Sequence, residues 1–223
     1  MKNKKATVLF LRHGKTKYTG QFPDLTPEGE KEIQLAADEI VKIVGGSTDI
    51  RMVSSTAPRA LGSASIIAHA IGYPMASVKH EEAIRCMDFY DAEGAQKLWS
   101  MFGTARNVDR AYEEDERFED GLVVEKRSAI QRRFMGYLGK LTEQFRNGEL
   151  HEITINTCHY EVLWRLAMLI DPGEPLIHGE IIRVDMSLSG PAENVVLECT
   201  FRDKMQKFAI QTPTDAFAAQ FDN

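Results

Sequence analysis

Cysteine is scarce in this sequence, and its three copies form no CxxC pair. Cys86, Cys158 and Cys199 lie far apart in a chain of 223 residues. An odd and scattered set of thiols is typical of a reducing compartment, where structural disulfides are rare. We therefore expect a cytoplasmic protein without disulfides.

Long hydrophobic runs and an excess of positive charge are also missing. No apolar run approaches the roughly 20 residues that a membrane-spanning helix needs. The apolar residues after Met-Lys-Asn-Lys-Lys are too few for the core of a signal peptide. The net charge of −6 disfavours bulk attraction to nucleic acid or to an anionic membrane. We expect neither a nucleic acid nor a membrane as a partner.

The composition that is present, 43% hydrophobic and 27% charged, is ordinary for a globular protein. The length is sufficient for one large α/β domain with a substantial core. No internal repeat, low-complexity segment or linker is visible. We therefore expect a single domain over residues 1–223.

The most informative stretch is Thr-Val-Leu-Phe-Leu-Arg-His-Gly at residues 7–14. Its short apolar run is typical of a buried strand, and the run ends in Arg12, His13 and Gly14. In open α/β sheets, ligands bind outside the carboxyl ends of the strands. Taken alone, the Arg-His pair is explained equally well by a surface position after a core strand.

Capping residues and hydrophobic spacing divide the rest of the chain. Thr26 and Pro27 are typical of a helix start, and Gly45 of a helix end. We expect helices over residues 27–44, 58–71, 122–145 and 160–170. Further strands are expected over residues 51–55, 75–78, 153–157, 181–188 and 194–201, with an edge strand over 205–211. This order predicts a mostly parallel sheet with helices on both faces and, from the late hairpin, at least one antiparallel strand.

An acidic insertion around residues 91–120 is expected to be the least regular part of the chain. Between Asp109 and Asp120 there are seven acidic residues and two arginines. One interpretation is a solvated helix or loop. The other is a lid that helps to select a substrate.

Three further segments occur in a fixed order after the Arg-His-Gly stretch. They read Leu-Thr-Pro-Glu-Gly at 25–29, Ser-Ser-Thr-Ala-Pro-Arg-Ala-Leu-Gly-Ser-Ala at 54–64, and Thr-Cys-His-Tyr-Glu-Val-Leu at 157–163. Together the four segments resemble the histidine phosphatase superfamily, whose members include the cofactor-dependent phosphoglycerate mutases. The resemblance implies a three-layer α/β/α sandwich and phosphoryl-transfer chemistry.

The resemblance also implies roles for four residues, and the chemistry of their side chains fits those roles. His13 would become the phosphohistidine, because a neutral imidazole can attack phosphorus. Arg12 and Arg59 would hold the phosphate, since guanidinium forks bind its oxygens in pairs. His159 would stabilise the charge of the transferred group. With this charge supplied by side chains, no cofactor and no metal is expected. His69, His80, His151 and His178 lie outside the motifs and are expected to be exposed or structural.

The segment that should supply the general acid departs from the family pattern. Where the family has a sequence like Leu-Arg-Glu-Ile-Asp-Phe-Gly, this chain reads Ile-Arg-Cys-Met-Asp-Phe-Tyr at residues 84–90. Cys86 therefore occupies the position of the expected glutamate. Asp88, two residues further on, and Glu82 are the alternatives for this catalytic role. Further departures lie near the expected pocket: Lys15, Tyr18, Thr19 and Tyr160.

Three hypotheses about function follow. The first is a phosphatase that acts on a small phosphorylated metabolite through a phosphohistidine. The second is a phosphoglycerate mutase. The third is a catalytically impaired relative that binds a phosphorylated ligand or partner, and the missing glutamate favours it.

Overall fold

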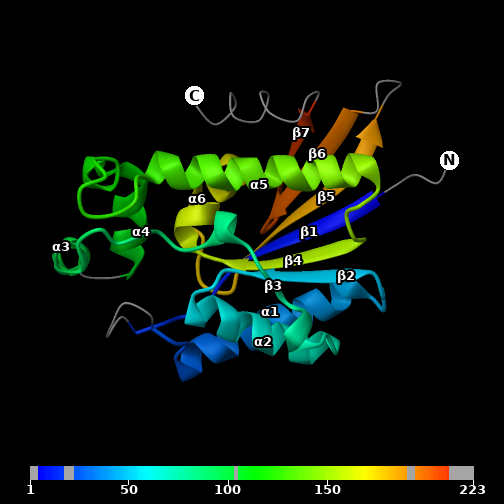
Figure 1. Ribbon diagram of the computed structural model, residues 1–223, viewed down its shortest axis with the longest axis horizontal. Helices are drawn as coiled ribbons and strands as arrows, with labels where there is room; N and C mark the ends of the chain where they lie inside the picture. Colours follow the sequence, from blue (N-terminus) through cyan, green and yellow to red (C-terminus); the bar gives the residue numbers. More distant parts are fainter. Residues whose placement is uncertain (1–4, 18–22, 103–104, 190–193, 211–223) are drawn as a thin grey trace.

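A computed structural model describes residues 5–17, 23–102, 105–189 and 194–210; Tyr18 and Thr19 lie outside them. The described residues form one seven-stranded sheet in the order β3-β2-β4-β1-β5-β6-β7 (Figure 1). The strands are β1 (Lys5–Arg12), β2 (Ile50–Ser54), β3 (Lys79–His80), β4 (Ile153–Cys158), β5 (Ile181–Ser189), β6 (Asn194–Phe201) and β7 (Lys204–Ile210).

The sheet has a parallel half and an antiparallel half. Strands β3, β2, β4 and β1 pair in parallel, whereas β5, β6 and β7 add antiparallel pairings at the other side of β1. The predicted fold class, a mostly parallel core with antiparallel strands, is confirmed.

Helices cover both faces of the sheet (Figure 1). Helices α1 (Pro27–Val44) and α2 (Pro58–Ile71) lie on one face, and α5 (Arg127–Asn147) and α6 (Tyr160–Ile170) lie on the other. Alternating side chains of β1 serve the two layers, since successive residues of a strand point to opposite faces. Val8 and Phe10 belong to the core beneath α5 and α6. Leu9 and Leu11 belong to the core beneath α1 and α2.

The start of α1 follows the predicted capping. The Thr26 side chain accepts a hydrogen bond from the Gly29 N–H at 3.1 Å, and Gly45 ends the helix with a φ of 55°. The same first turn explains Gly14. A Cβ at position 14 would collide with the carbonyl oxygen of Gly29, so glycine allows α1 to approach the end of β1 closely.

The structure corrects three predicted elements. Residues Met75–Ser77 form a 3-10 turn after Pro74, and the edge strand β3 follows at Lys79–His80. The segment expected to be irregular contains α3 (Ala92–Ser100), α4 (Ala105–Glu114) and a 3-10 turn at Glu116–Phe118.

The third correction concerns the start of α5, which begins at Arg127 and not at residue 122. The preceding residues are extended because their backbone pairs with residues 88–91. Tyr90 donates its N–H to the Val123 carbonyl at 2.9 Å, and Glu125 donates to the Asp88 carbonyl at 2.9 Å.

None of the helices in the described ranges is long and apolar enough to span a membrane. The antiparallel strands and the helices on both faces instead place most apolar side chains in the two cores.

Phe134 provides a test of the larger core. Its side chain is fully buried, and its ring meets Phe10 edge-on with centroids 5.4 Å apart. Phe134→Ala should lower the free energy of unfolding by about 3–5 kcal/mol, because it removes apolar contacts and leaves a cavity. The control Leu35→Ala, at a residue 72% exposed on α1, should change it by about 0.5 kcal/mol or less. Urea denaturation measures both, and equal losses would contradict this packing.

Candidate active site

The ends of three parallel strands bring the site together. Register places Leu11 of β1 beside Thr157 of β4, and Thr157 beside Ser54 of β2. The residues that follow these positions therefore meet at one edge of the sheet. They include Arg12, the last residue of β1, His13 directly after it, and His159 directly after β4. Arg59, in the first turn of α2, completes the group. These four side chains, predicted from the sequence, are brought together as expected.

His13 is buried and its tautomer is determined by its neighbours. Its Nδ1 lies 2.8 Å from the Gly14 carbonyl oxygen, which can only accept, so Nδ1 carries the proton. Its Nε2 accepts a hydrogen bond from Arg59 Nε at 3.1 Å. Burial lowers the pKa of His13 well below its usual value, and Arg59 and Arg12 lower it further. Nε2 is therefore the unprotonated nitrogen of a neutral ring at pH 7, and its lone pair accepts the hydrogen bond from Arg59.

His159 lies edge-on to His13, with ring centroids 5.1 Å apart. Its Nε2 is 2.7 Å from the Ser55 hydroxyl. Its Nδ1 is buried and has no hydrogen-bond partner among the described residues. Burial, Arg59 and His13 all lower the pKa of His159. A buried polar atom without a partner costs free energy, so this nitrogen is suited to contact a bound ligand.

Arg12 contacts a carboxylate, a backbone carbonyl and an aromatic ring. Its Nη1 donates to Asp109 Oδ2 at 2.7 Å, and its Nη2 donates to Asp109 Oδ1 at 3.2 Å. Nη1 also donates to the Leu176 carbonyl. The guanidinium lies over the ring of Tyr160, with Cζ 4.7 Å from the ring centroid, and stacking of this kind orients the fork.

The sequence did not reveal the roles of Asp109 and His178. Asp109 lies on α4, inside the acidic insertion for which the sequence allows either a solvated helix or loop or a lid. His178, expected to be exposed or structural, lies 5.7 Å from His13 between ring centroids and 3.3 Å from Arg12 Nη2. Neither residue has a motif around it. The number of acidic residues near Asp109 was the only signal, and it did not single out one of them.

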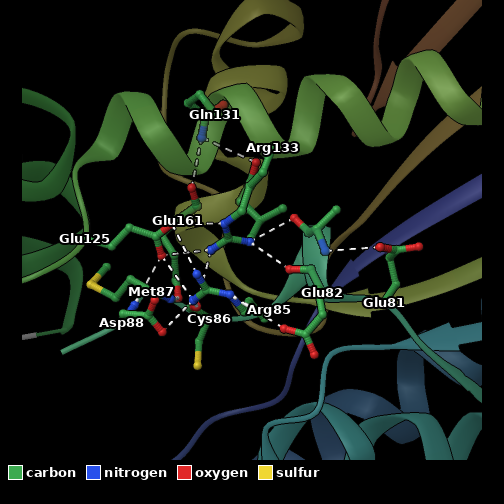
Figure 2. Close-up of polar contacts among 12 residues, drawn as sticks. Glu81, Glu82, Arg85, Cys86, Met87, Asp88, Glu125, Gln131, Arg133 and Glu161 are labelled. Atoms are coloured by element: carbon green, nitrogen blue, oxygen red, sulfur yellow. Dashed lines mark hydrogen bonds and ion pairs between the residues drawn. The ribbon is translucent and has the colours of Figure 1, made fainter.

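The segment that carries Cys86 is held by a network of polar groups around the buried Glu125 (Figure 2). Arg133 donates to the carbonyl oxygens of Ala83 at 2.8 Å and Cys86 at 3.2 Å. The Glu125 carboxylate accepts hydrogen bonds from the side chains of Arg133 and Arg85 and from the Asp88 N–H, the last at 3.2 Å. These contacts fix the backbone of residues 83–88 independently of any ligand.

The side chains of this segment diverge. The thiol of Cys86 is hydrogen-bonded to Arg59, and burial raises its pKa, so the thiol is protonated at pH 7. Asp88 instead pairs with Arg85 at 2.6 Å, and its side chain is 51% exposed. Glu82 also pairs with Arg85 and is 76% exposed. Figure 2 shows the Asp88 and Glu82 carboxylates directed to Arg85, with the Cys86 sulfur on the opposite side of the segment. Of the three residues expected to supply the acid, only Cys86 contacts the predicted phosphate-binding group.

Within the described ranges, no group of three or more His, Cys, Asp and Glu side chains is arranged to hold a metal ion. The positive charge near His13 comes from the side chains of Arg12 and Arg59.

The structure is an α/β/α sandwich in which two histidines and two arginines gather at the carboxyl ends of the central strands. It is therefore an α/β protein with a cationic site at the edge of the sheet where such folds bind ligands. The model of the histidine phosphatase superfamily (branch 1) matches residues 8–185. The chain belongs to this superfamily. No curated protein gives a significant sequence match.

Solved structures with the same fold have low sequence identity to this chain. A mycobacterial glucosyl-3-phosphoglycerate phosphatase in complex with inorganic phosphate is 16% identical, with a TM-score of 0.55, over 95% of this chain and 98% of its own. A phosphoglycerate mutase from Bacillus anthracis is 12% identical, with a TM-score of 0.60, over 99% and 98%. A protein described as mycobacterial hydrolase 2 is 15% identical, with a TM-score of 0.60, over 98% and 95%.

The position of His178 makes stability depend on pH in a defined direction. Burial, together with the positive charge of Arg12, lowers its pKa to about 3. Below pH 6.5 the unfolded chain takes up a proton here that the folded chain does not, so stability falls as pH falls from about 6.5 toward 3. One histidine contributes a slope of about 1.4 kcal/mol per pH unit. His178→Gln should reduce the slope by about this amount between pH 5.5 and 4.5 in denaturant titrations. Identical slopes for both proteins would contradict the burial of a neutral His178.

Proposed function

We propose that the chain is a phosphatase that hydrolyses a small phosphomonoester through a phosphohistidine on His13. The observation that carries this proposal is the hydrogen bond from Arg59 Nε to His13 Nε2. It identifies Nε2 as the unprotonated nitrogen, and it positions a guanidinium beside the atom that attacks. The same side chains that make His13 neutral are those suited to bind the incoming phosphate.

The first chemical step exchanges one bond to phosphorus for another. His13 Nε2 attacks as the ester oxygen departs on the opposite side, and the phosphoryl group is transferred to the ring. Arg59 turns its donors from His13 to the phosphate oxygens, Arg12 binds others, and His159 faces the transferred group with Nδ1. Water then attacks phosphorus and releases inorganic phosphate. These residues supply the required positive charge, so the proposal includes no cofactor or metal.

Relatives support the class of substrate. The structurally similar mycobacterial phosphatase acts on glucosyl-3-phosphoglycerate and has been solved with inorganic phosphate. A small phosphorylated metabolite in the cytoplasm is the corresponding proposal for this chain. Phosphoglycerate mutase activity ranks lower, because the mutase pattern at residues 84–90 is changed.

One observation favours a second candidate function, a relative that binds a phosphorylated ligand and turns it over poorly. Cys86 occupies the acid position, and its raised pKa makes its thiolate rare. A thiol is a weak proton donor, and loss of a general acid typically costs about 10²–10⁴-fold in rate. A comparison of p-nitrophenyl phosphate with an alkyl phosphate separates the two functions, since only the alkyl leaving group needs protonation. Turnover of both esters supports the first function, whereas phosphate binding with turnover of the aryl ester alone, or of neither ester, would favour the second.

Arg12→Ala and Arg59→Ala should each weaken the binding of inorganic phosphate. Each removes charged hydrogen-bond donors, and the expected loss is about 1.5–3 kcal/mol of binding free energy. Arg132→Ala, which changes an exposed arginine of α5, is the matched control and should bind phosphate as the wild type does. Isothermal titration calorimetry measures all three. Unchanged phosphate affinity in both Arg12→Ala and Arg59→Ala would contradict phosphate binding at this site.

Covalent phosphate should appear on His13 and not on His159. Mass spectrometry after rapid quenching with p-nitrophenyl phosphate, without acid, should find one phosphoryl group on the peptide that contains His13. His13→Asn should abolish the label, whereas His159→Asn should leave His13 as the labelled site. Label on His159 with none on His13 would reverse these roles.

A further inference from the structure

Helix α4 presents a carboxylate to the predicted phosphate-binding end of Arg12. Both oxygens of Asp109 are engaged, one by Nη1 at 2.7 Å and the other by Nη2 at 3.2 Å. The Asp109 side chain is only 13% exposed and the Arg12 side chain 5%. A paired contact of this kind uses the same geometry by which a guanidinium holds phosphate. Asp109 is therefore adjacent to any phosphate that Arg12 binds.

We propose that Asp109 is the proton donor to the leaving oxygen, in place of the glutamate that Cys86 replaces. This proposal rests on the proposed phosphatase function. The other carboxylates near the site are less suitable. Asp88 and Glu82 pair with Arg85. Glu161 is buried, and one of its oxygens accepts the Met87 N–H at 3.1 Å, so it holds the backbone of the Cys86 segment.

The surroundings of Asp109 favour a carboxyl group that changes its protonation state. A phosphate dianion and a carboxylate cannot share one guanidinium without strong repulsion unless a proton lies between them. Burial raises the pKa of Asp109, and Glu161 of α6 raises it further, whereas Arg12 opposes both effects. The remaining polar groups around it are Glu113 of the same helix, Tyr160 of α6, and His178, which contacts Arg12.

The position of α4 is maintained by a second contact that does not involve Arg12. Glu113, one helical turn after Asp109, accepts a hydrogen bond from the Tyr160 hydroxyl. Figure 1 shows α4 beyond the end of the sheet at which β1 finishes. The helix can therefore deliver the acid to the site.

The proposed reaction is balanced at each step. In the free protein both oxygens of Asp109 accept hydrogen bonds from Arg12, and Asp109 takes up a proton from solvent when the phosphate dianion binds beside it. As His13 Nε2 bonds to phosphorus, the P–O bond breaks with its electron pair on the leaving oxygen, and this proton moves from Asp109 to that oxygen. The alcohol leaves neutral, and the Asp109 carboxylate is again paired with Arg12. In the second half, Asp109 removes a proton from the attacking water as the N–P bond breaks, with its electron pair returning to Nε2. Phosphate is released and the acid is restored.

The test compares leaving groups in Asp109→Asn, and the matched control is Glu114→Gln, which changes an exposed residue of the same helix. With β-glycerophosphate, whose alkoxide needs protonation, kcat/KM of Asp109→Asn should fall about 10²-fold or more. With p-nitrophenyl phosphate it should stay within about threefold, because the phenolate leaves with little help. Aryl turnover in the same sample also shows that the variant is folded. Glu114→Gln should leave the ratio of the two rates unchanged.

The pH profile gives a second readout that a merely structural role would not alter. A general acid must be protonated, so wild-type turnover of β-glycerophosphate should fall as pH rises through the pKa of Asp109. Asp109→Asn should lack this limb.

Equal losses with both esters, or a selective loss of alkyl turnover in Glu161→Gln but not in Asp109→Asn, would overturn the assignment. Aryl turnover with label on His13 and an unchanged ratio in Asp109→Asn would overturn the role of Asp109 alone. No turnover of either ester and no label would contradict the phosphatase function and this inference together.

Discussion

Arg59 donates from Nε to Nε2 of His13, and the chemistry of the site depends on this contact. Together with the Gly14 carbonyl at Nδ1, it selects one tautomer and leaves the lone pair on the nitrogen that faces the arginines. Burial and two guanidinium groups keep the ring neutral. A histidine in this state is a competent nucleophile at pH 7, and an anion that draws Arg59 away frees the lone pair at the moment it binds.

Charge balance connects this contact to the rest of the site. Two buried arginines and two neutral histidines create a strongly positive region, and Asp109 provides a negative partner for Arg12. The proposed phosphate would enter this region as a second anion. In the proposed reaction, a proton on Asp109 reduces the repulsion between the two anions, and the same proton is then transferred to the leaving group. Meanwhile Glu125, Arg85 and Arg133 form a separate cluster that holds the backbone of the Cys86 segment in place.

Local rules predicted most of the fold. Buried strand runs, the Thr26 cap and the glycine helix ends each depend on neighbouring residues, and these features were predicted close to their observed bounds. The four residues His13, Arg12, Arg59 and His159 were predicted by motif and lie together. The predicted start of α5 was wrong because the residues before Arg127 pair in an extended conformation with residues 88–91, and this pairing overrides the helical spacing of the sequence. Asp109 and His178 could not be found, because they reach the site by tertiary packing from segments without a motif.

The protonation state of His13 is the most direct test of this account. Nitrogen-15 NMR of labelled imidazole distinguishes the two ring nitrogens. Between pH 6 and 7, in the absence of phosphate, we predict a protonated Nδ1 and an unprotonated Nε2 for His13. Arg59→Asn should shift the His13 Nε2 resonance, since the hydrogen bond from Arg59 is lost. A doubly protonated His13 at pH 7, or a proton on Nε2 with none on Nδ1, would contradict the account, because neither form has a lone pair where phosphorus must be attacked.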